Sequence, residues 1–309
     1  MFLMISGLSL FSCSTIEEDL ADCDETVEIS YQYLKGGQNR FGTDVSSMDL
    51  FIFDEQGYYV GRWNENDNSK FSPDYKMSLK LPPGTYSFIA WGGLKNNDYT
   101  IMDADQSTAM PTLPVVGQTK IEEMLLRVRE SNLREVDYRP SDLFYGDVLT
   151  YTLPDMKPGV PSQLVIDLDK FTKQVDVKIN GVTSDDVTAY LTSPNGRYTF
   201  LDDYEAPNVG IKYMPIVEDQ INDLYSSTFH TLRMSFGREI KLTVWDNKTN
   251  SEIFVADILE DYIRKIPEYS TQAAIDAEDY FLIEIWLDPF LQFTVKVNGW
   301  VVSNSITDF

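Results

Sequence analysis

Apolar and polar residues alternate with a period of two along much of this chain, and this pattern constrains its fold more than any other feature. The segment VEISYQY, from Val27 to Tyr33, places an apolar side chain at every second position. Successive side chains of a strand point to opposite faces, so the segment predicts a strand buried on one face. Turn signals such as Gly36-Gly37 and Asn180-Gly181 separate segments of this kind. The chain is therefore predicted to be all-β, built from antiparallel β-sandwiches.

Further strands are predicted from the same alternation and from short apolar runs. They cover residues 48–53, 58–63, 75–81, 86–91, 148–153, 163–168, 174–179, 187–191, 198–201, 231–236, 240–245, 281–287 and 293–297. Residues 124–128 fit either a strand or a short helix. Residues 253–266 carry apolar side chains at intervals of three and four, which predicts one amphipathic helix. The polar stretch 92–117 is predicted to be a loop.

The length of 309 residues allows two domains. Residues 154–161 contain three prolines and one glycine, and proline lacks the N–H that a strand ladder needs. We place the domain boundary there, with one sandwich at 26–154 and a second at 162–309 that contains the single short helix. The two halves share a strand-rich style without a clear sequence repeat.

Composition excludes several classes of protein. The formal net charge is −24, which repels phosphate backbones and argues against nucleic acid as a partner. Hydrophobic residues make up 43% of the chain, enough to form cores rather than a disordered chain. Only Cys13 and Cys23 are present, so neither a disulfide framework nor a cysteine-rich metal site is expected.

The first residues resemble an export signal that ends in a lipid attachment site. An apolar run from Phe2 leads into Leu10-Phe11-Ser12-Cys13, which resembles the bacterial lipobox, and the run is too short to span a bilayer. The resemblance implies a signal peptide at 1–12 and a diacylglyceryl group on Cys13. Residues 13–25 then form an acidic tether, whose Glu17-Glu18-Asp19 resembles the surface-export signal of Bacteroidetes lipoproteins. The pattern lacks a Lys or Arg before the apolar run, and an ordinary signal peptide with an incidental cysteine is the alternative.

Catalytic signatures are missing from the sequence. His230 is its only histidine, and neither a G-x-S-x-G nucleophile elbow nor a phosphate-binding glycine loop is present. We therefore predict no enzymatic activity, no metal and no cofactor, and a structural or surface position for His230. The 49 acidic residues would allow a glycosidase pair, but nothing in the pattern selects one. Core packing is expected for the five tryptophans, Trp63, Trp91, Trp245, Trp286 and Trp300.

Five motifs, taken in order, resemble one family. They are DLFIFD at 49–54 followed by Gly57, LPPGTYSFIAWG at 81–92, LFYG at 143–146, Leu232-Arg233, and VKVNGW at 295–300. Together with the lipobox, this order resembles the FimB-type fimbrial anchor lipoproteins of Bacteroidales, over nearly the whole chain.

The resemblance implies two tandem transthyretin-like sandwiches and a protein that anchors a type V pilus to the outer membrane and helps set its length. A fimbrial pilin subunit is the implied partner, bound through β-strand addition. In an anchor the first strand, at 27–33, would stay in its groove.

Lys35 and Arg40 follow the first strand and are candidate sites for a basic-specific protease. Cleavage there would release the strand and make the chain a shaft or tip pilin, whereas a plain basic turn would leave it in place. The segment 301–309 is a candidate for a donor strand. A glycan-binding surface lipoprotein remains the alternative from a different functional class.

Overall fold

The first sandwich is built from one seven-stranded sheet, whose strand order is β5-β4-β7-β11-β12-β1-β6. Inward side chains of β1, β6 and β12 share one core with those of β4 and β7, so this sheet closes into two layers. Alternation sets which residues enter that core: β1 buries Val27, Ile29 and Tyr31 and leaves the residues between them half-buried. The strands are β1 (Glu25–Gln32), β4 (Met48–Phe53), β5 (Tyr59–Glu65), β6 (Lys76–Leu81), β7 (Gly84–Gly92), β11 (Phe144–Leu153) and β12 (Ser162–Lys170).

The second sandwich packs a six-stranded sheet against a five-stranded sheet. The larger sheet has the order β17-β18-β13-β21-β22-β23, with β13 (Lys173–Asn180), β17 (Val217–Ile221), β18 (Leu224–Thr231), β21 (Tyr280–Leu287), β22 (Gln292–Val297) and β23 (Trp300–Ile306). The smaller has the order β10-β16-β14-β19-β20, with β10 (Glu135–Val136), β14 (Val187–Ser193), β16 (Ile211–Tyr213), β19 (Lys241–Asp246) and β20 (Ser251–Asp257).

The structure is a computed structural model that describes residues 25–103, 113–154, 160–182, 186–201, 210–287 and 292–306. Within these residues, smaller elements accompany the two sandwiches. A three-stranded sheet joins β8 (Tyr99–Asp103), β9 (Met124–Val128) and β15 (Arg197–Thr199), and a hairpin joins β2 (Leu34–Lys35) to β3 (Gln38–Asn39). The short helices are α1 (Phe41–Asp44), α2 (Ile258–Asp261) and α3 (Gln272–Ala277), with 3-10 turns η2 (Asn68–Lys70), η3 (Ile121–Glu123), η4 (Ile263–Lys265) and η5 (Pro267–Tyr269).

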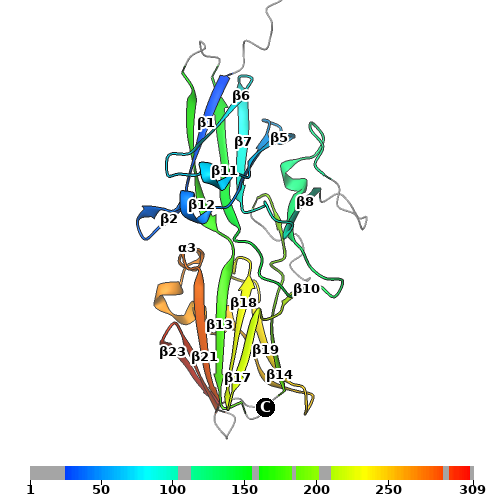
Figure 1. Cartoon of the computed structure of the whole chain (residues 1–309), viewed down its shortest axis with the longest axis vertical. Helices are drawn as coiled ribbons and strands as arrows, with labels where there is room; N and C mark the ends of the chain where they lie inside the picture. The colour runs from blue at the N-terminus through cyan, green and yellow to red at the C-terminus, as the bar shows by residue number, and fades with distance from the viewer. Residues whose placement is uncertain are drawn as a thin grey trace, which may run out of the picture.

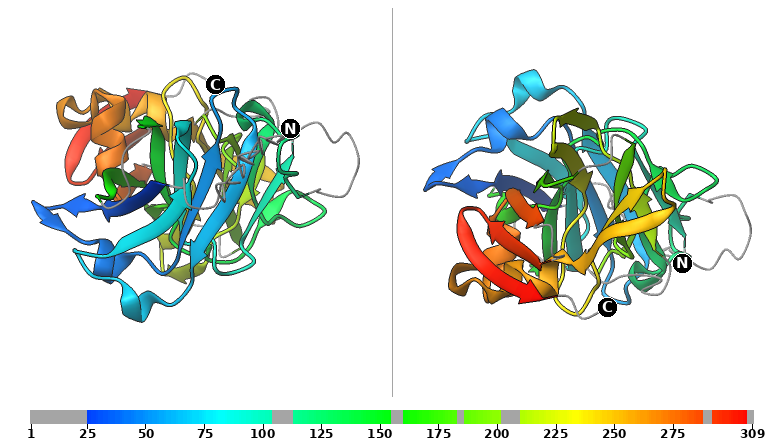
Figure 2. Two further views of the ribbon diagram at one scale, coloured as in Figure 1. Left: turned by 90° about the horizontal axis from the view of Figure 1, so that it is seen from above. Right: turned by 90° about the horizontal axis from the view of Figure 1, so that it is seen from below.

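The two sandwiches stack along the long axis of the molecule (Figure 1). Seen along that axis, the β2–β3 hairpin lies on the same side as the orange and red segments of the second sandwich (Figure 2). One buried apolar cluster runs through both, from Trp91 and Tyr145 of the first sheet to Val177 of β13. The two sandwiches therefore share a core at their junction.

The predicted all-β fold of two sandwiches is confirmed, but the sheets are mixed rather than antiparallel. β1 pairs parallel with β12 and antiparallel with β6. In the same way, β13 pairs parallel with β21 and antiparallel with β18. The two sandwiches thus repeat a local topology, although their sequences show no clear repeat.

The predicted start of the second sandwich at residue 162 is wrong. β12 pairs with β1 and β11 of the first sheet, so the chain passes between the sandwiches at Phe171-Thr172. The proline-rich segment 154–161 connects two adjacent strands of one sheet. Prolines mark an interruption of pairing, which occurs between neighbouring strands as readily as between domains.

Three local predictions also need correction. Strand β8 lies within the predicted loop 92–117, and the strand expected at 231–236 is β18, which ends at Thr231. The predicted helix 253–266 begins as strand β20, and only then continues as α2 and η4. Asp257 separates the two, because its carboxylate accepts from the backbone N–H groups of Leu259 and Glu260 and caps α2. Residues 124–128, left open between strand and helix, form strand β9.

Gly146, in the LFYG motif, allows β11 and β12 to pack closely. A Cβ at this position would lie 2.4 Å from Cγ2 of Ile166. We expect Gly146→Ala to lower the free energy of unfolding by about 1–3 kcal/mol through overpacking, measured by urea denaturation. Gly61→Ala is the control, because its Cβ would meet only the ring of the half-buried Trp63 at 3.0 Å. An equal loss in both variants would contradict the close-packing argument.

Candidate functional site

The first strand fills its position in the sheet completely. β1 pairs with β12 over Val27–Gln32 and with β6 over Glu25–Ser30, so both of its edges are hydrogen-bonded. The side chains of Val27 and Ile29 are fully buried, and Tyr31 is 1% exposed. No open edge remains beside β1 for a strand from another subunit.

Lys35 and Arg40 lie near one another, on the hairpin that follows β1 and just after it. Gly36 and Gly37 turn this hairpin, both with positive φ values that favour glycine. The ammonium group of Lys35 forms an ion pair with Asp279, just before β21 in the second sandwich. The Tyr33 hydroxyl donates to the same carboxylate at 3.2 Å. The hairpin is therefore fastened to the second sandwich.

Arg40 stands at the beginning of α1. Its guanidinium forms an ion pair with Asp44 at 2.9 Å, one turn later. Its side chain is 46% exposed, and its backbone N–H donates to the carbonyl of Tyr33. Both basic side chains reach the surface, but the peptide bonds beside them belong to folded structure.

Three of the sequence motifs meet in one row across the first sheet. Asp49 on β4 lies opposite Trp91 on β7, Trp91 lies opposite Tyr145 on β11, and Tyr145 lies opposite Asp169 on β12. The rings of Trp91 and Tyr145 are 4.7 Å apart, and Phe171 packs edge-on against Trp91 at 5.3 Å. These motif residues therefore form the core of the junction.

Asp49 is the buried end of this row. Its side chain is 1% exposed and pairs with the guanidinium of Arg62 at 2.8 Å. Burial raises the pKa of Asp49, and the charge of Arg62 opposes that rise. The aspartate of the DLFIFD motif thus has a structural ion pair rather than an open reactive position.

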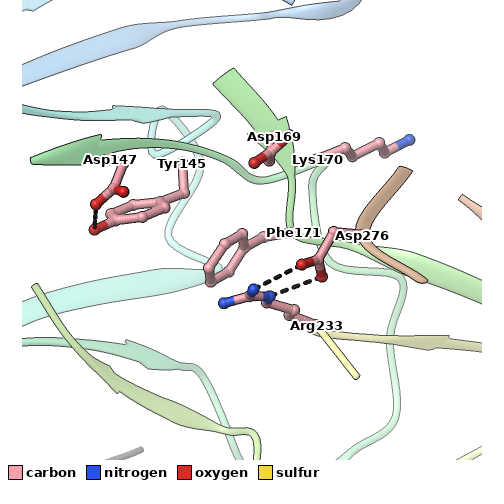
Figure 3. A pocket seen from close by; sticks show the side chains of 7 residues that line it. All are labelled: Tyr145, Asp147, Asp169, Lys170, Phe171, Arg233 and Asp276. Atoms are coloured by element: carbon pink, nitrogen blue, oxygen red, sulfur yellow. Dashed lines mark hydrogen bonds and ion pairs between the residues drawn. The ribbon is translucent and has the colours of Figure 1, made fainter. Parts of the chain in front are cut away.

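A polar pocket of about 130 Å³ opens beside this row, between the two sandwiches (Figure 3). Arg233, of the Leu232-Arg233 motif, holds Asp276 of α3 through two hydrogen bonds of 2.8 and 2.7 Å. Its guanidinium also lies over the ring of Phe171, 5.4 Å from the centroid. The lining residues are Tyr145, Asp147, Asp169, Lys170, Phe171, Arg233 and Asp276. Arg233 therefore connects the second sandwich to the link between the two.

The closing motif has a comparable role. The side-chain carbonyl of Asn298 accepts from the backbone N–H of Leu282 at 2.7 Å, and its amide donates to the Tyr269 hydroxyl at 2.8 Å. Asn298 has a positive φ of 48°, which asparagine tolerates better than most residues. It fixes the β22–β23 turn against η5.

The burial of Lys173 could not be predicted from the sequence, because Lys173 stands at the beginning of an alternating strand, as many surface lysines do. It is 1% exposed, and its ammonium donates to the backbone carbonyl of Asp276 at 2.6 Å. Burial lowers the pKa of Lys173 to about 8, against the opposing effect of nearby carboxylates.

The remaining candidates lie in different surroundings. His230 on β18 is 8% exposed, and burial together with the charge of Arg139 lowers its pKa. Core packing is confirmed for Trp91, which is fully buried, but is wrong for Trp300, which is 51% exposed. The segment proposed as a donor strand lies in β23, paired with β22 of its own sheet, and residues 307–309 lie outside the described part.

Two further findings concern only the residues that the structure describes. No group of three or more His, Cys, Asp or Glu side chains among them is placed to hold a metal ion. No helix within them has the length and apolarity needed to cross a membrane. Cys13, Cys23, the predicted signal peptide and all of the predicted tether except Glu25 lie outside these residues.

A family model described as fimbrillin-A associated anchor proteins Mfa1 and Mfa2 matches residues 20–305. The chain belongs to this family of fimbria-associated surface proteins, which is not a family of enzymes. The FimB-type anchor resemblance is thereby confirmed. No curated protein matches the chain.

Solved structures share the fold. A Bacteroides thetaiotaomicron protein described as a candidate polysaccharide-binding protein has a TM-score of 0.79 at 20% identity, over 92% of this chain and 99% of that one. The fimbrial anchor protein Mfa2 of Porphyromonas gingivalis has a TM-score of 0.75 at 18% identity, covering 92% and 100%. A candidate adhesin of Bacteroides ovatus has 0.75 at 17%, covering 90% and 95%.

The buried charge of Lys173 predicts an unusual pH dependence. The folded pKa of about 8 lies below the ordinary value of 10.5, so the unfolded chain binds the proton more strongly. Between pH 8 and 10.5, the contribution of Lys173 to the free energy of unfolding therefore rises with pH, by up to about 3 kcal/mol. This gain is lost again as the pH falls through the folded pKa of about 8. We expect Lys173→Met to abolish this rise, measured as the wild-type minus variant difference in unfolding free energy from pH 7 to 9.5. A constant difference across that range would contradict it.

Proposed function

We propose that this protein is a surface-exposed outer-membrane lipoprotein that anchors a type V fimbria and limits its length. The diacylglyceryl group on Cys13 would hold it in the membrane, since several acyl chains together give stable attachment. The acidic tether would connect that group to the first sandwich. The start of β1, at the outer end of the first sandwich (Figure 1), supports a membrane-proximal place for this domain.

The observation that carries the anchor role is the occupied position of β1. Each fully buried large apolar side chain contributes about 1.5–3 kcal/mol, and β1 buries Val27, Ile29 and Tyr31. Both edges of β1 are also paired. A groove filled this firmly by the chain's own strand cannot accept a strand from another subunit, so growth of the fibre ends at this protein.

The pilin partner would bind by β-strand addition elsewhere, where main-chain hydrogen bonds can form along a sheet edge. Edge strand β6 directs Lys76 and Lys80 outward, and charged side chains disfavour pairing with a further strand. The second sandwich, at the far end from the proposed membrane side, is the expected contact.

Cys13→Ala tests the lipid anchor, with Cys23→Ala as the matched control. We expect Cys13→Ala to fold but to appear in the medium together with its fimbriae, while Cys23→Ala stays in the membrane fraction. The measurement is immunoblotting and electron microscopy of the cell-bound and released fractions. Retention of the Cys13 variant in the membrane would overturn the lipid attachment.

Proteolysis at Lys35 or Arg40 distinguishes an anchor from a shaft or tip pilin. For an anchor we expect protein isolated from intact cells to retain the segment from Cys13 through β1, and Arg40→Gln to leave its mass unchanged except for the substitution. Peptide mass mapping of the purified mature chain makes the measurement. A mature chain that begins at Gly36 or Phe41 would assign the protein to the shaft or tip.

A glycan-binding lipoprotein is the second candidate, favoured by the exposed Trp300. Immunogold labelling of whole cells separates the two roles. Label at the base of each fibre supports the anchor, whereas surface label without any fibre favours glycan binding.

A further inference from the structure

The β1–β12 pair has a geometry suited to a particular direction of force. β1 runs toward the second sandwich, since Tyr33 and Lys35, just beyond its end, contact Asp279 there. β12 lies parallel to β1, with six paired positions from Val27 opposite Ser162 to Gln32 opposite Asp167. The two strands therefore begin at the same outer end and finish at the junction (Figure 1).

The chain leaves β12 directly into the second sandwich. Only Phe171 and Thr172 separate the end of β12 from β13, which lies between β18 and β21 in the interior of its sheet. A pull applied at the start of β1 and at the second sandwich thus acts on opposite ends of one parallel strand pair.

We propose that the β1–β12 pair is a mechanical clamp that carries tension between the two ends of the molecule. When parallel strands are pulled from opposite ends, the ladder between them is sheared, and its hydrogen bonds bear the load together. When strands are pulled apart from one shared end, the bonds break one after another. The bonds of a parallel pair are evenly spaced along the ladder, so a shearing load is shared among them, and the first case resists force more than the second. The direction of this load rests on the anchor role proposed above.

Side chains strengthen the same pair against sliding. Ile29 of β1 lies opposite Leu164 of β12, and both are buried in the core of the first sandwich. The Ser30 hydroxyl donates to the carbonyl of Leu164 at 3.1 Å. On the other side of β1, Lys76 of β6 forms an ion pair with Glu28 at 2.8 Å. Displacement of β1 along its axis would disrupt all these contacts at once.

Single-molecule pulling on the full chain, with both native cysteines changed to serine, tests the clamp. One handle is always the N-terminus, and the second is a cysteine at either of two exposed strand positions. Asp167→Cys lies opposite Gln32, at the far end of the pair, and shears it. Lys80→Cys on the edge strand β6 lies opposite Thr26, at the near end of β1, and unzips the β1–β6 ladder one bond after another without shearing β1 along β12.

We expect the unfolding force in the Asp167 geometry to exceed that in the Lys80 geometry at least twofold at the same pulling rate. Equal forces would overturn the clamp. That outcome would leave the anchor role intact, because membrane attachment is tested separately through Cys13.

A pair of leucine variants assigns the resistance to the clamp rather than to overall stability. Leu164→Ala removes a side chain between the clamped strands, and Leu153→Ala removes one from the same core at the end of β11, outside the pair. Both variants are expected to lower the urea midpoint. For Leu164→Ala, we expect the unfolding force to fall more in the Asp167 geometry than in the Lys80 geometry. For Leu153→Ala, we expect no such difference between the two geometries. Equal losses of unfolding force from the two variants in the Asp167 geometry would also overturn the proposal.

Discussion

The contact on which the rest of the structure depends is the packing of Phe171 between the two sandwiches. Its ring lies against Trp91, Tyr145 and Tyr198, at centroid distances of 5.3, 5.2 and 5.1 Å, and beneath the guanidinium of Arg233. A two-residue link would normally allow neighbouring domains to move. Here the link itself is the centre of a shared apolar core, so the position of each sandwich is set by the other.

Local features of the fold could be predicted well from the sequence. Alternation located β1, β13 and β21 because it reports which face of a strand is buried, and this depends on a few adjacent residues. The helix predicted at 253–266 failed because apolar residues of β20 and of α2 together imitate a helical period across the Asp257 cap. Periodicity alone cannot detect a change of element within such a window.

Long-range features of the fold and site could not be read in this way. The assignment of β12 depends on its pairing with β1, more than a hundred residues earlier in the chain. Each motif could be recognised in the sequence, but their alignment in one row from Asp49 to Tyr145 follows only from strand register. Lys173 carried no signal at all, since a lysine at the beginning of an alternating strand is ordinarily solvated.

The three-stranded sheet of β8, β9 and β15 joins the two halves of the chain. It pairs β9, from the first half of the chain, with β15, from the second, placing Leu126 opposite Tyr198. In the same way, β10 joins a sheet of the second sandwich through β16. Each half thus completes a layer of the other, and cutting the chain at Phe171 would expose apolar surface on both pieces. Neither half can therefore stand as an independent unit, because each needs the other to cover its apolar junction surface.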